Sequence, residues 1–195
     1  MIKKRLLIFF FCFVVFAILI LILCLFLQNN AEFSSDYANE IRVLNESFPS
    51  DIIVYGEDVG FDATLNFRTI SSITEENLTS DPKYLYTFLV INDRTGTVTI
   101  TEEDLELCKK FCDENNLNFY YIGEQYLGLM NKIGFTYGLI SPNTKSVAYV
   151  NAYGTQTAVH GLWNIEDDEY LDSNPGLLGQ ILAVSFVDHV IKTLN

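Results

Sequence analysis

Residues 84–122 read YLYTFLVINDRTGTVTITEEDLELCKKFCDENNLNFYYI. The stretch begins with a run, Tyr84–Ile91, that is apolar on both of its faces, as in a central strand covered on both sides. A helical pattern follows over Thr101–Asn115, and a second strand is expected at Leu117–Ile122. A strand, a helix and a second strand of this combined length match one right-handed βαβ unit.

The helix in this unit carries a start signal and an apolar face. Thr101 and Asp104 resemble a capping box, with Asp in place of the usual Glu or Gln. Cys108 and Cys112 lie four residues apart on the apolar face, beside Leu105 and Phe111. A disulfide between them would strain a regular helix, and two cysteines are too few for a metal site. We therefore expect buried thiols.

The rest of the domain continues with short elements. A Ser-Pro-Asn-Thr-Lys turn between two predicted strands suggests a hairpin, and Asn174-Pro175 is typical of a helix start. We expect strands at Asp51–Tyr55, Leu65–Ile73, Phe135–Ile140 and Ser146–Tyr153, a short helix or loop at Thr74–Asp81, and helices at Glu124–Lys132 and from Asn174 to about Thr193.

This order of elements predicts the fold class. Alternating strands and helices favour an α/β fold, here one three-layer α/β sandwich with a mixed sheet. The predicted hairpin keeps an alternative open, an α+β fold with a mainly antiparallel sheet.

Residues Leu6–Leu27 form an unbroken run of 22 apolar side chains. As a helix the run would be roughly 33 Å long, enough to cross a hydrocarbon core of about 30 Å. Lys3, Lys4 and Arg5 precede it, and positive flanks stay in the cytoplasm. We expect a cytoplasmic stub over 1–5, a transmembrane helix over 6–27, a juxtamembrane stalk or helix over 28–49, and an extracytoplasmic domain over 50–195.

Two other interpretations of the run are weaker. A cleaved signal peptide has a shorter apolar core and a small-x-small cleavage site, and Asn29-Asn30-Ala31 lacks the first small residue. Lipid attachment at Cys24 would require a small residue before it, where Leu23 stands. The lipid bilayer is therefore the first partner that the sequence predicts.

The net charge of the chain limits the classes of partner that the domain is expected to bind. The chain of 195 residues has 12 basic and 25 acidic residues, a net charge of −13. Without Lys3, Lys4 and Arg5 the balance is 9 against 25, a net charge of −16. A domain this acidic repels phosphate backbones, which argues against nucleic-acid binding. The same charge attracts basic partners.

One loop is a candidate ligand site. Asn92–Thr97 follows the central strand and precedes a helix, and ligands in open α/β sheets gather at such carboxyl ends. We predict a ligand cleft near Asp93 and Arg94, with Gly123 after the next strand as its neighbour. The loop lacks the glycine pattern of a phosphate or dinucleotide site, so no cofactor is expected.

Other polar residues carry weaker signals. A Ser141–His160–Asp93 triad can be drawn, but no Gly-x-Ser-x-Gly motif supports it, and His160 and His189 are expected to be structural. The acidic clusters at 57–62 and 166–172 do not fit an EF-hand loop; we expect solvated loops, with weak Ca²⁺ binding as the alternative. We predict neither a catalytic residue nor a metal ligand.

These observations favour a membrane-anchored interaction or accessory module in an envelope or surface assembly. A membrane-tethered ligand-sensing or solute-binding domain is the first alternative. A membrane-tethered hydrolase without a standard motif is the second.

Overall fold

The computed structural model describes residues 37–136, 141, 143–152, 155–160, 168–174 and 176–194. The predicted transmembrane run, Leu6–Leu27, lies outside these ranges. Within them, no helix combines the length and the apolar character needed to cross a membrane. The chain divides into two compact units, Met1–Asn39 and Glu40–Asn195, and the fold described below belongs to the second.

One six-stranded sheet forms the centre of this unit, in the order β2-β1-β3-β4-β5-β6. Strands β2, β1, β3 and β4 run parallel, whereas β5 and β6 are antiparallel to their neighbours. The strands are β1 (Ser50–Gly56), β2 (Phe67–Ile70), β3 (Tyr86–Asn92), β4 (Leu117–Ile122), β5 (Ser146–Ala152) and β6 (Thr155–His160). The prediction of an α/β fold with a mixed sheet is confirmed. The mainly antiparallel alternative is wrong.

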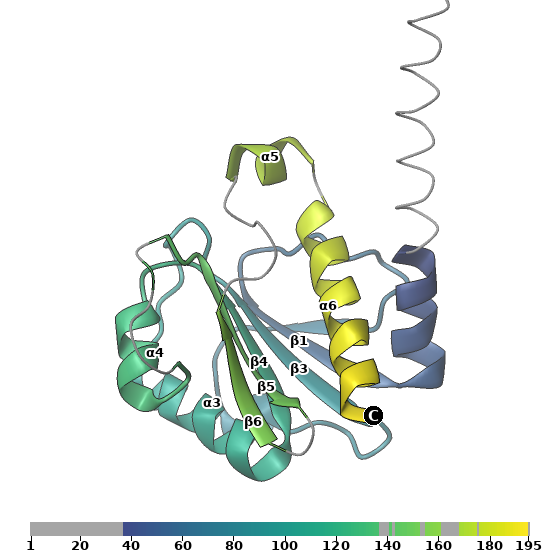
Figure 1. Cartoon of the computed structure of the whole chain (residues 1–195), viewed down its shortest axis with the longest axis horizontal. Helices are drawn as coiled ribbons and strands as arrows, with labels where there is room; N and C mark the ends of the chain where they lie inside the picture. The colour runs from purple at the N-terminus through teal and green to yellow at the C-terminus, as the bar shows by residue number, and fades with distance from the viewer. Residues whose placement is uncertain are drawn as a thin grey trace, which may run out of the picture. The chain divides into compact units, whose positions relative to one another are not determined.

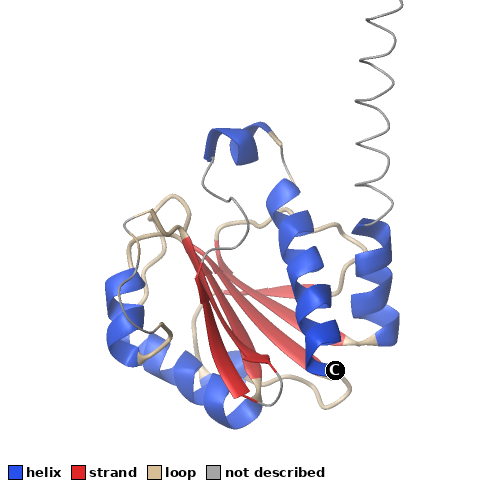
Figure 2. Ribbon diagram, viewed as in Figure 1, coloured by secondary structure: helices blue, strands red, loops and turns tan. Residues whose placement is uncertain are grey.

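Helices lie on both faces of the sheet (Figures 1 and 2). The helices α3 and α4 cover one face, and α6 lies across the other. Residues 37–42 are α-helical and continue into the π-helix η1 (Val43–Ser47). The later helices are α2 (Glu75–Leu78), α3 (Glu102–Asn115), α4 (Leu127–Ile133), α5 (Asp168–Ser173) and α6 (Leu177–Leu194).

Side chains along the central strands point alternately to the two faces of the sheet and contribute to a hydrophobic core on each face. Leu89 of β3 and Phe119 of β4 are fully buried in the cluster that contains Cys108 and Cys112 of α3. On the opposite face, Phe88 stacks on Phe186 of α6 with ring centroids 4.4 Å apart. Such aromatic pairs add about 0.5–1.5 kcal/mol to the gain from burial. Successive residues of one strand therefore hold helices on opposite sides.

The start and the apolar face of α3 match the sequence analysis. Thr101 Oγ1 accepts a hydrogen bond from the Asp104 amide at 3.1 Å, and Asp104 Oδ2 accepts one from the Thr101 amide at 2.9 Å. Cys108 and Cys112 carry thiol groups and are fully buried. Burial raises the pKa of both thiols. The predicted capping box and the predicted buried thiols are both confirmed.

The predicted hairpin between Phe135–Ile140 and Ser146–Tyr153 is wrong, because β5 pairs with β4 and β6. Phe135 and Thr136 form a bend after α4 instead of opening a strand, and residues 137–140 lie outside the described ranges. Phe135 turns into the core, where its ring stacks on Phe119 at 4.4 Å. The antiparallel partner of β5 on its outer side is β6, which pairs Ala152 with Thr155. The second predicted strand is also shorter than expected, since only Phe67–Ile70 of 65–73 is extended.

Glycines allow α6 to lie against the loop that follows β1. A Cβ atom on Gly179 would stand 2.7 Å from the Gly60 carbonyl oxygen and 2.9 Å from the Phe61 nitrogen. Both neighbours are backbone atoms, which cannot rotate away. Gly60 also has a positive φ of 73° and approaches Gly176. The first turn of α6 is therefore held at the carboxyl end of β1 by a contact that only glycine permits.

We predict that Gly179→Ala lowers the free energy of unfolding by about 1–3 kcal/mol, because overpacking forces two backbone segments apart. The matched control is Gly128→Ala in α4, where an added Cβ meets nothing within 4 Å. This change should raise stability by roughly 0.5–1 kcal/mol, because alanine loses less entropy in a helix. Thermal unfolding of both variants measures the difference. Equal effects of the two substitutions would contradict the described packing.

Candidate functional site

The carboxyl ends of three parallel strands meet at one edge of the sheet. The register pairs Gly56 of β1 with Asn92 of β3, and Asn92 with Ile122 of β4. From β1, the sheet continues to β2 on one side and to β3 and β4 on the other. Ligands of open α/β sheets bind outside the strand ends where the order reverses in this way. The predicted cleft residues all follow these strands.

Asp93 is buried at this edge, with 1% of its surface exposed. One carboxylate oxygen accepts a hydrogen bond from the Val98 amide at 2.9 Å, and the other accepts one from the Tyr121 hydroxyl at 2.9 Å. Burial, followed by the hydrogen bond to Asp93, raises the pKa of the Tyr121 phenol. Both oxygens of Asp93 thus hold the protein's own groups. Asp93 joins the loop after β3 to strand β4.

Gly123 lies directly against Asp93, as the sequence predicts. Its φ is +150°, and a Cβ atom there would stand 2.7 Å from the Asp93 carbonyl oxygen and 2.7 Å from the Tyr121 hydroxyl. The Gly123 amide donates to the Lys145 carbonyl at 2.8 Å. Glycine is therefore needed for close packing at this position, and the role of the residue in ligand binding stays a prediction.

Arg94 contacts α5. Its guanidinium pairs with Asp172 at 2.6 Å, with 22% of the Arg94 side chain and 66% of the Asp172 side chain exposed. This ion pair ties the loop after β3 to the segment that leads into α6. Of the three predicted residues, Asp93 and Gly123 thus lie against each other, and Arg94 forms an ion pair with α5.

Glu57, which the sequence analysis assigned to a solvated acidic loop, is partly buried in the same edge. Its carboxylate accepts hydrogen bonds from the Thr95 amide at 3.0 Å, from the Thr97 hydroxyl at 3.1 Å and from the Thr95 hydroxyl. These donors would suit an anionic ligand, and the protein places its own carboxylate there. The contact spans 38 residues of sequence, so no local pattern could have revealed it.

Asn92 completes the closure of this edge. The residue is 1% exposed, and its side-chain amide donates to the Asp58 carbonyl at 2.9 Å and to the Glu57 carbonyl at 3.3 Å. It thereby fixes the loop after β1 against the end of β3. Glu57, Asn92 and Asp93 thus bond to the protein's own groups at the edge where ligands of related architectures bind.

The other candidates from the sequence have different outcomes. Ser141 is exposed, and the side chain of His160 lies outside the described part, so the Ser141–His160–Asp93 triad stays untested. His189 is buried on α6, with its ring edge-on to Phe88 at 6.2 Å. Within the described residues, no group of His, Cys, Asp and Glu side chains could hold a metal ion.

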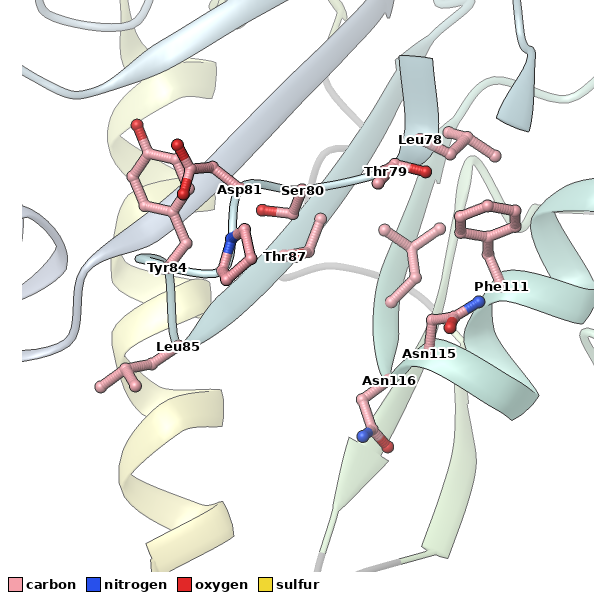
Figure 3. A pocket seen from close by; sticks show the side chains of 12 residues that line it. Leu78, Thr79, Ser80, Asp81, Tyr84, Leu85, Thr87, Phe111, Asn115 and Asn116 are labelled. Atoms are coloured by element: carbon pink, nitrogen blue, oxygen red, sulfur yellow. The ribbon is translucent and has the colours of Figure 1, made fainter. Parts of the chain in front are cut away.

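A hollow lies at the opposite edge of the sheet, near the amino ends of β3 and β4. It has a volume of about 350 Å³ and lies between the loop after α2 and the C-terminal end of α3 (Figure 3). Its walls contain apolar, hydroxyl and amide side chains and one carboxylate. The lining residues are Leu78, Thr79, Ser80, Asp81, Pro82, Tyr84, Leu85, Thr87, Phe111, Asn115, Asn116 and Leu117.

Leu85 is the most exposed large apolar side chain at this hollow, with 66% of its surface accessible. The sequence analysis placed it inside the apolar run of the central strand. In the structure β3 begins at Tyr86, so Leu85 precedes the strand. The Asp81-Pro82-Lys83 turn could have indicated this later start of β3. A turn directly before an apolar run can leave the first apolar residues of the run outside the sheet.

Comparisons with known proteins add no assignment: no family model matches the chain, and neither a curated protein nor a solved structure is significantly similar to it. The class that the described residues define is an α/β domain with a mixed sheet.

We predict that Asp93→Ala costs about 2–4 kcal/mol of stability, because two buried donors lose their acceptor. Tyr121→Phe should cost less, since the aromatic ring keeps its packing. In the double variant the losses should fall short of their sum by about 0.5–3 kcal/mol, the range for residues that share a contact. Urea unfolding of the four proteins measures this coupling. Strict additivity would show that the Asp93–Tyr121 hydrogen bond does not form.

Proposed function

We propose that this protein is a single-pass membrane protein, with its N-terminus in the cytoplasm, whose acidic α/β domain acts by contact as an interaction or accessory module in an envelope or surface assembly. The observation that carries the anchor is the run Leu6–Leu27, which has 22 apolar side chains and no charge. Lys3, Lys4 and Arg5 before it support the orientation.

Two features of the domain support a role in contact. At the carboxyl ends of the strands, Glu57, Asn92 and Asp93 bond to the protein's own backbone and hydroxyl groups. At the other edge, the hollow is open and bordered by the exposed Leu85. Exposed apolar groups beside a shaped depression are typical of binding surfaces.

A second candidate function is a membrane-tethered ligand-sensing or solute-binding domain. The close approach of Asp93 and Gly123 at the reversal of strand order favours it. In that case a ligand would have to displace the Glu57 carboxylate from the Thr95 and Thr97 donors.

A membrane-impermeant, amine-reactive cross-linker on intact cells tests the first proposal. The full chain would carry a C-terminal tag, and Lys83, Lys110 and Lys132 offer amines with 50–67% of their side chains exposed. We expect the reagent to reach these lysines and to shift the tagged chain to a discrete larger species. A cytoplasmic protein should stay unlabelled, as the control for membrane integrity.

The two parts of the proposal fail in different ways in this experiment. If the lysines stay unlabelled while a known outer-face protein reacts, the orientation is wrong. If they are labelled and the chain still migrates at the mass of a monomer, the proposed role in an assembly is wrong.

A further inference from the structure

We propose that the hollow between the loop after α2 and the C-terminal end of α3 binds a basic, apolar-flanked segment of a partner protein. An arginine or lysine side chain of that segment would lie beside Asp81, and an apolar neighbour would cover Leu85. This inference rests on the proposed function and names the chemistry of the partner.

The apolar part of the hollow offers a surface for a side chain. Leu78, Phe111 and Leu117 line the hollow and are buried in the core, and Leu85 lines it with most of its side chain exposed. The gain from burying a leucine side chain grows with the apolar area that is removed from water. A partner residue that covers Leu85 would recover part of this energy.

The polar part of the hollow favours a positive group. Asp81 is the one charged residue among the lining residues, all of which are described. The helix α3 ends at this hollow, where Asn115 and Asn116 line it. The last carbonyl groups of a helix lack intrahelical partners and carry partial negative charge. The Ser80 hydroxyl oxygen is also buried without a hydrogen-bond partner among the described residues, so an incoming N–H group could bond to it.

The protein already holds a cation at this place. The Lys83 ammonium lies 3.5 Å from the Asp81 carboxylate and 4.7 Å from the centre of the Tyr84 ring. Lys83 and Asp81 are both more than half exposed, and such surface pairs contribute little to stability. The contact shows how a carboxylate and an aromatic face receive a cation here. It is weak enough for the cation of a partner to replace it.

The loop that carries these groups is held in place before any partner binds. Asp81 Oδ1 accepts the Lys83 amide at 3.0 Å, and the Leu85 amide donates to the Pro49 carbonyl at 2.7 Å. Arg68, paired with the buried Asp51 at 3.0 Å, donates to the Thr79 carbonyl at 3.4 Å. A surface that is already ordered loses less entropy on association. The net charge of −16 beyond the apolar run would also draw a basic segment toward the domain.

The test uses the full chain in lipid nanodiscs and an array of nonapeptides. Each peptide has a central arginine flanked by pairs of Leu, Phe, Tyr or Ala, and a matched set carries the neutral isostere citrulline instead. We expect binding to arginine peptides with large apolar neighbours, and weaker binding to their citrulline forms. The best peptide, labelled with fluorescein, is then titrated in solution by anisotropy.

Matched variants connect this binding to the hollow. Asp81→Asn keeps the turn and removes the charge, and should weaken binding about two- to fivefold, as for an exposed ion pair. Asp62→Asn is its control, because Asp62 caps the Thr64 amide in a similar exposed turn away from the hollow. Leu85→Ser should weaken binding about tenfold, and Ile191→Ser, at the other exposed large apolar side chain among the described residues, should not.

A gain of affinity provides an independent check. Lys83→Gln removes the internal competitor and should strengthen binding of the arginine peptide about two- to fivefold. The inference is overturned if citrulline and arginine peptides bind equally, if no peptide binds, or if Asp81→Asn and Leu85→Ser bind like the wild type. None of these results would count against the proposed function, which the cross-linking experiment tests. Failure to form the cross-linked species, with peptide binding retained, would count against the proposed function alone.

Discussion

The closure of the sheet at the carboxyl ends of β1, β3 and β4 is the constraint on which the rest of the domain depends. Asn92 bonds to the loop after β1, and Asp93 bonds to β4 and to its own loop. Two adjacent residues thus hold three strand ends in register. Because Gly60 at the same edge receives the first turn of α6, this closure also positions the helix that covers one face of the sheet.

The consequence for function is a division between the two edges of the sheet. At the carboxyl edge, the carboxylates of Glu57 and Asp93 accept hydrogen bonds from the Thr95 and Val98 amides, and these bonds stabilise the loop after β3. At the amino edge, the hollow beside Leu85 combines apolar walls with a carboxylate and a helix C-terminus. We therefore propose that the domain acts by contact at the amino edge, and that the apolar run Leu6–Leu27 anchors it in a membrane.

Local patterns predicted the βαβ unit well, because burial on both faces of β3 and the capping box of α3 are written in consecutive residues. They also predicted that Asp93 and Gly123 would meet, since parallel strand ends share an edge. They failed where distant contacts decide. Phe135 was expected in a strand, but its ring stacks on Phe119 in the core. Glu57 was assigned to a solvated loop, because its partners Thr95 and Thr97 lie far along the chain.

Hydrogen–deuterium exchange of the Thr95 and Val98 amides tests the central claim most directly, because both donate to side-chain carboxylates at the closed edge, at 3.0 and 2.9 Å. Measured on the full chain in nanodiscs without added ligand, both amides should exchange slowly, at rates like those of the neighbouring strand β3. Exchange at the rate of an open loop, with β3 still protected, would show that this edge is an open cleft and would contradict the account.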